Sequence, residues 1–522
     1  MGDGYIETWN ITKPERLSGR GVVTTQHRLA SAAGARVLAR GGNAVDAAVT
    51  AALTIGAVEP WMSGTGGGGI MLIYLAAEQR TYAVDFTMLA PQALNPADYP
   101  LSEGDGGDLF GWPAVEGDRN VNGPFSFAVP GNVAGLALAL ERFGTLDFAD
   151  AISPAIEHAE AGMPADWYAS LKIASGAAVL ARFPESARVY LPGGHVPCGE
   201  WGGEPPRIQL GNLAHTLKRL REAGPRDFYE GEIAATICRD MQAVGGLVGA
   251  ADLRDYQAQV KDVTPVDYRG HQIHAAPGLT AGPTLLDALR RLSAHTPGHV
   301  PDPDMYLGYA NALTEAYAER LATMGDVDDS RAPACTTHMS IADADGNVVA
   351  LTQTLLSVFG SKVMLPESGI LWNNGVMWFD PRPGRPNSMA PGKRPLANMC
   401  PTIVVRDDGA RFALGASGGR RIMPAVFQLA SFLTDYRMNL DAAMHQGRID
   451  YCAGPEVGVD RVLGDAVLER IAACHPAAFA THGVYPALYA CPNTAGISAD
   501  GRLSGAAFVM SPWAHTAIAE DF

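Results

Sequence analysis

The sequence has few charged residues for its length and, among them, few basic ones. Of the 522 residues 18% are charged, and 39 lysines and arginines against 55 acidic residues give a formal charge of −16. Such an acidic chain repels nucleic acid and anionic membranes unless its basic residues gather in one place, and it contains no lysine–arginine run. Hydrophobic residues make up 47%, which excludes bulk disorder. We therefore expect a globular protein that binds neither nucleic acid nor membranes.

Cysteine is also scarce. The seven cysteines are odd in number, scattered, and never spaced as CxxC, so neither a disulfide framework nor a zinc site is expected. The first four residues lack the basic and apolar segments of a signal peptide. The most apolar stretch, residues 44–62, contains Asp46 and Glu59, which favours a buried helix over a membrane span. We expect a cytoplasmic protein without a metal or cofactor.

Hydrophobic periodicity predicts the main secondary structure. Helices are expected at 30–40, 44–57, 133–142, 213–223 and 305–324, and strands at 70–75, 339–342, 348–354, 402–406 and 412–414. Gly41-Gly42 is expected to end the first helix and Asn43 to cap the second. Residues 101–124, rich in glycine, proline and acids, are predicted to form a surface loop. The sharpest change in composition lies near residue 336, where short β-rich segments begin.

A glycine run precedes the first predicted strand. Ser63-Gly64-Thr65-Gly66-Gly67-Gly68-Gly69 lacks the Gly-Lys-Ser/Thr ending of a phosphate-binding loop and leads into a strand, not a helix. The run instead indicates a backbone that passes close to packed chain or to a substrate.

A hairpin is predicted around Asp345-Gly346, because this dipeptide separates two alternating segments. With these two residues as the turn, Thr337 faces Thr354 and Thr336 lies one position further along. Threonine pairs across hairpins are ordinary sheet stabilisation, so this pair alone does not indicate chemistry.

A longer set of motifs gives the pair a different meaning. In the second half these are residues 336–340, 359–360, 367–371, 373–374, 391–395, 401–404 and 415–422, and in the first half residues 41–48, 63–69, 85–86, 90–91, 129–131 and 268–270. In this order the chain resembles the γ-glutamyltransferase family of N-terminal-nucleophile hydrolases over nearly its whole length. The resemblance implies an α+β fold, a four-layer αββα sandwich with two antiparallel sheets between helix layers.

The resemblance also implies a self-cleaving precursor. The bond between Cys335 and Thr336 would be cut to give a large subunit, 1–335, and a small subunit, 336–522, which together form one αββα unit. Thr336 would be the nucleophile, its freed α-amino group the general base, and Thr354 the residue that orients its hydroxyl. Gly418 and Gly419 would supply the N–H donors of an oxyanion hole. The partners implied are a small-molecule amide and the two subunits of one precursor, as a single heterodimer or a pair of heterodimers.

The chain departs from the transpeptidases of this family at the substrate-binding positions. These positions hold Thr87, Leu356, Gly375, Trp378, Ala397 and Asn398, with Asn374 retained. In the transpeptidases the corresponding groups bind the α-carboxylate and α-amino group of glutamate through charge-assisted contacts of roughly 1.5–3 kcal/mol each. Two shortened segments, before Thr336 and between Asp380 and Pro391, add to the difference. The pattern resembles the amidohydrolase branch, with its oxamate amidohydrolase-like and cephalosporin acylase-like members.

Several further side chains have two interpretations. Arg420, Arg382 and Arg385 are candidates for binding a substrate carboxylate, or are solvated surface residues. His338 and Phe359 are expected to be packed residues without a chemical role. Three functions stay open: hydrolysis of an amide with a non-glutamyl acyl group, γ-glutamyl hydrolysis or transfer, and a precursor that is never cut and acts as a binding protein.

Overall fold

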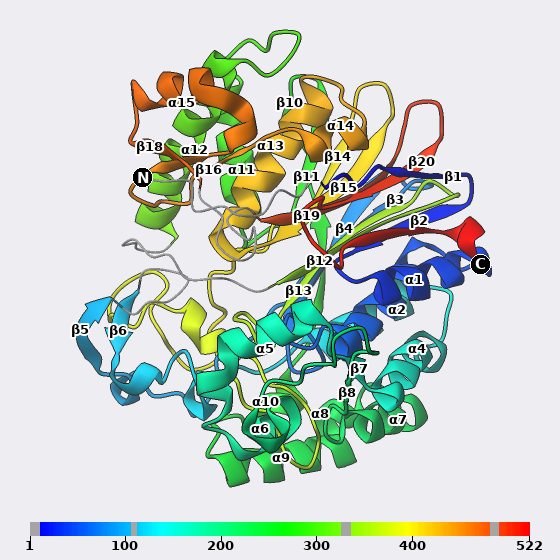
Figure 1. The fold of residues 1–522 in the computed structure, drawn as a ribbon, viewed down its shortest axis with the longest axis vertical. Helices are drawn as coiled ribbons and strands as arrows, with labels where there is room; N and C mark the ends of the chain where they lie inside the picture. The colour runs from blue at the N-terminus through cyan, green and yellow to red at the C-terminus, as the bar shows by residue number, and fades with distance from the viewer. Residues whose placement is uncertain (1–10, 106–111, 325–335, 481–489) are drawn as a thin grey trace.

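A computed structural model describes residues 11–105, 112–324, 336–480 and 490–522. Within these residues two seven-stranded sheets, antiparallel at every strand pair, form the centre (Figure 1). The first sheet has the order β1 (Arg16–Ser18), β20 (Leu503–Ala507), β19 (Cys491–Ile497), β15 (Arg411–Ser417), β14 (Thr402–Val405), β11 (His271–Ala275), β10 (Val266–Tyr268). The second has the order β21 (His515–Ile518), β2 (Gly21–Thr25), β12 (Thr337–Asp343), β13 (Val348–Thr354), β3 (Gly68–Leu75), β4 (Arg80–Phe86), β9 (Gln259–Val263).

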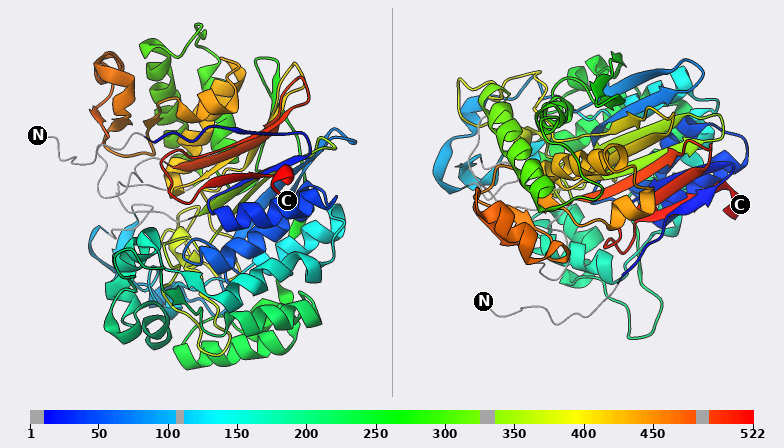
Figure 2. Two further views of the ribbon diagram at one scale, coloured as in Figure 1. Left: turned by 45° about the vertical axis from the view of Figure 1, so that its right-hand side comes forward. Right: turned by 90° about the horizontal axis from the view of Figure 1, so that it is seen from above.

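Helices cover the outer face of each sheet. Above the first sheet lie α11 (Gly282–Leu292), α12 (Pro303–Thr323), α13 (Ile422–Thr434), α14 (Leu440–His445) and α15 (Gly464–Ala472). Below the second lie α1 (Arg28–Ala39), α2 (Ala44–Val58), α3 (Asn132–Phe143) and α4 (Phe148–Ala161). The left view of Figure 2 shows the same order of layers. The predicted αββα sandwich is confirmed.

The remaining elements are shorter or peripheral. They are α5 (Trp167–Leu180), α6 (Pro184–Tyr190), α7 (Leu213–Ala223), α8 (Asp227–Glu230), α9 (Glu232–Val244) and α10 (Ala250–Asp255), the pairs β5 (Leu101–Asp105) with β6 (Pro113–Val115) and β7 (Met163–Pro164) with β8 (Arg207–Ile208), and a small sheet of β16 (Ile449–Asp450), β17 (Val457–Val459) and β18 (Ala477–Phe479). The β5–β6 pair lies inside the segment predicted to be a loop, so that prediction is wrong in part.

The predicted helices and strands occur with small shifts at their ends. The start of α2 follows the expected capping, because Asn43 Oδ1 accepts hydrogen bonds from the N–H groups of Val45 and Asp46, 2.9 and 3.0 Å away. Asp46 in turn accepts from the N–H of Asn43, which completes a capping box.

The central hairpin is built into the middle of the second sheet. Strands β12 and β13 lie between β2 and β3, so segments from both sides of residue 336 alternate in one sheet. The glycine run is explained by this neighbourhood. A Cβ on Gly67 would stand 2.4 Å from the carbonyl oxygen of Thr354, and one on Gly69 would stand 2.5 Å from that of Thr352. The run therefore passes against packed chain, which decides between the two interpretations of its glycines.

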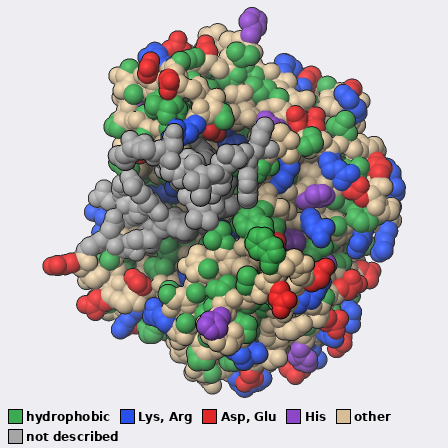
Figure 3. All heavy atoms as spheres, in the orientation of Figure 1, with side chains coloured by type: hydrophobic (Ala, Val, Ile, Leu, Met, Phe, Trp, Pro, Cys, Tyr) green, Lys and Arg blue, Asp and Glu red, His purple; other side chains and the backbone are tan. Residues whose placement is uncertain are grey.

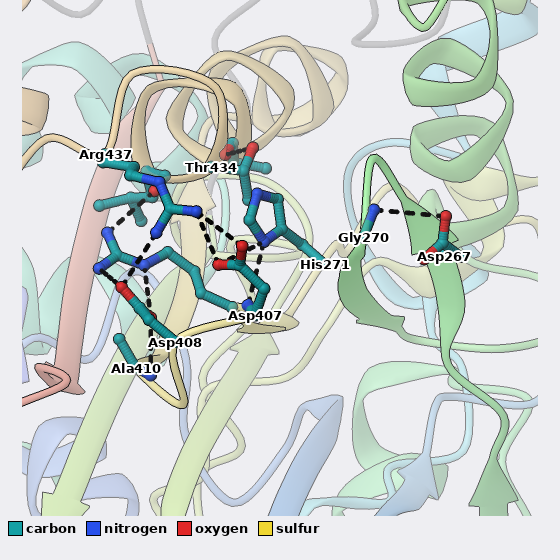
Figure 4. Close-up of polar contacts among 11 residues, drawn as sticks. Asp267, Gly270, His271, Asp407, Asp408, Ala410, Thr434 and Arg437 are labelled. Atoms are coloured by element: carbon teal, nitrogen blue, oxygen red, sulfur yellow. Dashed lines mark hydrogen bonds and ion pairs between the residues drawn. The ribbon is translucent and has the colours of Figure 1, made fainter.

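The other end of β15, remote from Ser417, is fixed by an ionic network (Figure 4). Arg437 pairs with Asp407 at 2.7 Å and with Asp408 at 3.1 Å. The N–H of Asp407 donates to Nδ1 of His271, 3.1 Å away. The network joins the β14–β15 turn to the end of α13.

The surface agrees with the charge pattern of the sequence. On the face shown in Figure 3, acidic and basic side chains are interspersed over the described residues. In the same part of the chain no helix has both the length and the apolar character needed to cross a bilayer.

Candidate active site

Thr336 and Thr354 meet at the open end of the central hairpin. Thr337 pairs with Gln353 and His338 with Thr352, and extending this register by one residue sets Thr336 opposite Thr354. The Thr336 hydroxyl donates to Oγ1 of Thr354 at 3.4 Å, and both side chains are buried. The expected proximity of the two hydroxyls is therefore confirmed.

The predicted register itself is wrong by one residue. The turn holds three residues between Asp343 and Asn347, with Gly346 at φ 90°. Asp343 fixes this longer turn, because its carboxylate accepts from the N–H and the side-chain amide of Asn347, both at 2.9 Å. A three-residue loop with glycine in the left-handed region is the common alternative to a two-residue turn. Thr337, as expected, lies in the strand ladder.

The chain immediately after Thr354 is strained. Leu356 has a φ of 85°, a conformation that costs a non-glycine residue about 1–3 kcal/mol. In this conformation its N–H donates to Oγ1 of Thr354 at 2.7 Å. Oγ1 of Thr354 thus accepts two hydrogen bonds, from a backbone N–H and from the Thr336 hydroxyl, which fixes the oxygen in one position.

His338 lies on the same face of β12 as Thr336 but is enclosed between the sheets. Its Nδ1 is 2.9 Å from the Thr352 hydroxyl, and its Nε2 is 2.9 Å from the Ser340 hydroxyl. Burial lowers the pKa of His338 to about 3, so the ring is neutral. A Cβ on Gly415 would stand 2.2 Å from this ring, so only glycine fits there. His338 is a packed strand histidine, as expected.

The glycine pair after β15 begins only three residues beyond Gly415. Gly418 and Gly419 have φ values of 135° and 60°, and a Cβ on Gly418 would stand 2.9 Å from Cα of Ala490. They lead through the short 3₁₀ helix η6 (Gly419–Arg421) into α13. Backbone N–H groups at such a helix start attract negative charge.

Two groups hold the segment that follows the glycines. The Tyr317 hydroxyl on α12 donates to the carbonyl oxygen of Arg420. Arg421 forms an ion pair with Asp450 at 3.2 Å. Burial raises the pKa of Asp450 to about 6, although Arg421 and Arg448 lower it.

Three of the predicted substrate-binding residues lie together in one buried apolar cluster. Leu356, Trp378 and Ala397 share the cluster with Met377, and all are at most 3% exposed. We call this set, together with Met88 and Trp112, the apolar pocket cluster. Sequence reasoning missed Trp112 because its segment has the composition of a loop; in the structure it is 3% exposed and lies 6.0 Å from the Arg420 guanidinium.

Gly375 and Asn374 are tightly packed beside this cluster. A Cβ on Gly375 would stand 2.7 Å from Cβ of Ala128 and 3.0 Å from Sδ of Met88. The Asn374 amide donates to the carbonyl of Val121 and to the Ser357 hydroxyl, and accepts from the N–H of Ser357. These contacts engage both ends of the Asn374 side chain within the protein.

Thr87 belongs to an ionic network. Its hydroxyl donates to Asp85 and accepts from Arg394, both at 2.7 Å. Asp85 also pairs with Lys261 at 2.6 Å. Burial raises the pKa of Asp85, but the neighbouring Lys261, Arg394 and Thr87 outweigh it and leave that pKa below its ordinary value.

Asn398 is held by an arginine that the sequence did not single out. Arg320 on α12 is 4% exposed and donates to Oδ1 of Asn398 at 3.2 Å, to the carbonyl of Ala397 and to Thr280 and Thr284. A guanidinium group can only donate, so the oxygen of the Asn398 amide must face it. The Nδ2 group of Asn398 then has no hydrogen-bond acceptor among the described residues, although the side chain is 7% exposed.

The arginines near the site differ in their surroundings. Burial, with a smaller contribution from the charge of Arg420, lowers the pKa of Arg320 to about 10. Arg382 pairs with the buried Asp380 at 2.9 Å, and Arg385 is exposed. Phe359 is buried in a different cluster, against Trp61 and Tyr190, which confirms core packing.

The last two expectations concern the cleavage bond and a metal site. Cys335, and with it one side of the predicted cleavage bond, lies outside the described residues. Among the residues that are described, no group of three or more histidine, cysteine or acidic side chains is arranged to hold a metal ion.

The fold and the hairpin first define a class. Two antiparallel sheets between helix layers form the αββα sandwich that the resemblance to N-terminal-nucleophile hydrolases implied. The sequence model of the family described as Gamma-glutamyltranspeptidase matches residues 30–335 and 329–476. The chain belongs to this family, as its motifs indicated.

Individual relatives support the same family assignment. The chain is 34% identical over 546 residues to the Acylase ACY 1 proenzyme of Pseudomonas sp. (strain V22), covering 96% of this chain and 94% of that protein. It is 31% identical over 484 residues to the glutathione hydrolase proenzyme of Bacillus subtilis (strain 168), covering 82% and 80%. Its fold is similar to the crystal structure of cephalosporin acylase from Bacillus halodurans, with a TM-score of 0.82, 22% identity, and coverage of 99% and 98%.

Proposed function

We propose that the chain is a self-cleaving amidohydrolase whose nucleophile is Thr336. The observation that carries the proposal is the Thr336–Thr354 hydroxyl pair at 3.4 Å, with Thr336 immediately before the central strand β12. Relatives at 34% and 31% identity are described as proenzymes, which supports maturation by cleavage into two subunits that stay together.

The maturation step is an N-to-O acyl shift followed by hydrolysis. Oγ1 of Thr336 attacks the carbonyl carbon of residue 335, the C–N bond breaks, and the nitrogen becomes the free α-amino group of Thr336. Water then hydrolyses the ester, which leaves a carboxyl group on residue 335. In turnover the α-amino group accepts the proton of Oγ1, the acyl group of the substrate passes to Oγ1, the amine leaves, and water releases the acid.

The protein groups around this centre have separate roles in the proposal. Thr354 orients the Thr336 hydroxyl, and Leu356 fixes Thr354 through its backbone N–H. The N–H groups of Gly418 and Gly419 would stabilise the oxyanion that forms on the carbonyl oxygen, since both lie at the start of a helix.

The acyl group is proposed to lack the α-amino group of glutamate. The apolar pocket cluster supplies no carboxylate to pair with an ammonium group. Ala128 and Met88 pack so closely against Gly375 that a larger side chain, able to bind an ammonium group, does not fit at this position. The unpaired Nδ2 of Asn398, whose Oδ1 accepts from Arg320, instead favours an acyl group that carries a carboxylate or another oxygen acceptor.

A gel and a substrate panel test the proposal. The wild-type protein should give two bands of about 35 and 20 kDa, in proportion to residue number in the 55.0-kDa chain, and Thr336→Ala should give one. Two bands from Thr336→Ala would contradict the assignment of the nucleophile. One band from wild type would favour the uncleaved binding protein.

The panel compares anilides with γ-glutamyl, succinyl and butyryl groups, together with oxamate. The proposal expects turnover of an acyl group without an α-amino group. A clear preference for γ-glutamyl anilide would favour the second candidate, a γ-glutamyl hydrolase or transpeptidase, which the relationship to a glutathione hydrolase proenzyme supports.

A further inference from the structure

A second polar cluster lies directly behind the hydroxyl pair, on the opposite face of the hairpin. Thr337 and Gln353 are cross-strand partners, each next in sequence to one of the two threonines. Successive side chains on a strand point to opposite faces, so these two point away from Thr336 and Thr354. The Gln353 amide donates to the carbonyl of Ala52 on α2 and to the Ser63 hydroxyl, both at 3.0 Å. This face of the hairpin is therefore covered by α2.

Glu59 is the C-cap residue that follows α2, and its side chain is 2% exposed. The residues after Glu59 are bonded to the chain that follows Thr354. The N–H of Leu355 donates to the carbonyl of Met62 at 3.0 Å, and the N–H of Phe359 donates to the carbonyl of Trp61 at 2.9 Å. The turn that carries Glu59 and the strained segment that carries Leu356 thus form one backbone-bonded unit.

Three buried polar atoms in this cluster have no hydrogen-bond partner among the described residues. They are Oε2 of Glu59, Oγ1 of Thr337 and Oε1 of Gln353. A neutral carboxyl group has one hydrogen to donate, whereas a carboxylate only accepts. The side-chain oxygen of Gln353 is an unpaired acceptor, so a neutral Glu59, which has a hydrogen to donate, suits this cluster better than a carboxylate. Leaving buried polar groups unpaired costs about 1–3 kcal/mol each.

The electrostatic surroundings of Glu59 point the same way. Burial raises the pKa of Glu59 to about 8, while the Lys172 ammonium on α5 and the Thr337 hydroxyl lower it by less. Among the described residues, no other charged side chain has a resolved effect on this pKa. At neutral pH most molecules therefore carry the uncharged carboxyl group.

We propose that Glu59 is a positioning residue, a neutral buried carboxyl group that holds the Thr337–Gln353 pair and so the strand ends that carry Thr336 and Thr354. It touches neither the substrate nor the reacting atoms. The inference rests on the proposed function, since it concerns the placement of that nucleophile.

The sign of the pH dependence follows from the raised pKa. The contribution of the neutral carboxyl group is complete below pH 4.5, its ordinary pKa, and is lost as the pH rises through about 8. The α-amino group of Thr336, as a base, instead gains activity as the pH rises through its usual range of about 7.7–8.0. Turnover should then fall again at alkaline pH.

The test compares two substitutions at one position. Glu59→Gln keeps size and hydrogen bonding but does not titrate, so it should stay within a few-fold of wild type at pH 7 and lose the alkaline fall in kcat. Glu59→Leu should lower kcat at all pH values by about 10- to 100-fold, because a misplaced nucleophile costs about that much in rate. Glu232→Gln, an exposed partner of Arg219, is the matched control and should keep the wild-type profile.

Melting curves add a readout that does not need turnover. The Tm of the wild type should fall between pH 7 and 9 by more than that of Glu59→Gln, whether or not Glu59→Leu folds. In a Thr337→Val background the Tm difference between the wild-type Glu59 and the Glu59→Gln variant should become much smaller, since this substitution deletes the neighbouring hydroxyl.

An alkaline limb in Glu59→Gln equal to that of wild type would overturn the inference. A wild-type protein that is neither cut nor active would instead refute the proposed function, and the positioning role with it. In that case the melting curves would still report whether the carboxyl group is neutral.

Discussion

Thr336 and Thr354 face each other across the β12–β13 hairpin, with their hydroxyl oxygens 3.4 Å apart and the N–H of Leu356 2.7 Å from Thr354 Oγ1. The hydroxyl of Thr354 is thus fixed by the backbone before it contacts Thr336. The pair depends on one strained residue and on the turn at Asp343.

Replacing Thr354 should slow both maturation and turnover. Thr354→Ala removes the oxygen that holds Thr336, and misaiming a nucleophile costs up to about 100-fold in rate. Thr354→Ser keeps the oxygen and should retain most of the rate. The fraction of cut chain against time and the kcat of the cut enzyme measure the effect. An alanine variant that matures and turns over like wild type would contradict the orienting role.

Turnover of γ-glutamyl anilide should be poor, with no acceleration by glycylglycine. Thr87→Arg should help little, because the new cation would join Lys261 and Arg394 around the single carboxylate of Asp85. Steady-state kinetics of wild type and variant give the answer. A wild-type kcat/KM of about 10⁴ M⁻¹s⁻¹ or more, an ordinary value for an enzyme, would show that the acyl group is glutamyl after all.

Asn398→Asp should weaken the use of acyl groups that end in a carboxylate. The aspartate still accepts from Arg320, but it lacks the Nδ2 donor and repels an anion. A charge-assisted contact of about 1.5–3 kcal/mol corresponds to a loss of about 10- to 150-fold in kcat/KM for succinyl anilide. Butyryl anilide serves as the internal control. Equal losses for the two anilides would contradict carboxylate recognition by Asn398. Arg437→Gln, at the far end of β15, should change neither value.

Acid should destabilise the protein through the buried His338. Burial lowers the pKa of His338 to about 3, so the stability that depends on its neutral ring is complete above pH 6.5 and is lost as the pH falls toward 3. Tm should therefore decline over this range. His338→Gln should flatten the decline, although it should also lower Tm at pH 7. His215→Gln, on the exposed face of α7, should leave the slope unchanged. An identical acid slope in His338→Gln and wild type would show that the ring does not titrate on unfolding.

Much of the fold follows from local patterns in the sequence. The capping box at Asn43 and Asp46 is encoded within four residues, and α7 and β13 occur with the predicted bounds because their periodicity is strong. The ordered motifs from Gly41 to Ile422 were sufficient to identify the family, and the family implied the αββα sandwich.

The sequence came close to the hydroxyl pair but could not fix its register. Asp345-Gly346 is compatible with a two-residue turn and with a three-residue loop, and the carboxylate of Asp343 selects the second by binding Asn347. A shift of one residue changes which side chain faces which.

The groups that would decide specificity come from segments far apart in the chain. Arg320 and Asn398 are 78 residues apart and meet only because α12 packs beside the segment leading into β14. Trp112 has the sequence surroundings of a surface loop, yet it is buried with Leu356 and Ala397. Glu59 has an ordinary place at a helix end, and only the packing of α2 against the hairpin buries its carboxyl group behind Thr337. The sequence by itself determined the family, the helix caps and the proximity of the two threonine hydroxyls, because those signals are local. The tertiary structure decided the register, the shape of the pocket and the state of the buried charges, because burial and hydrogen-bond partners arise only when distant segments pack together.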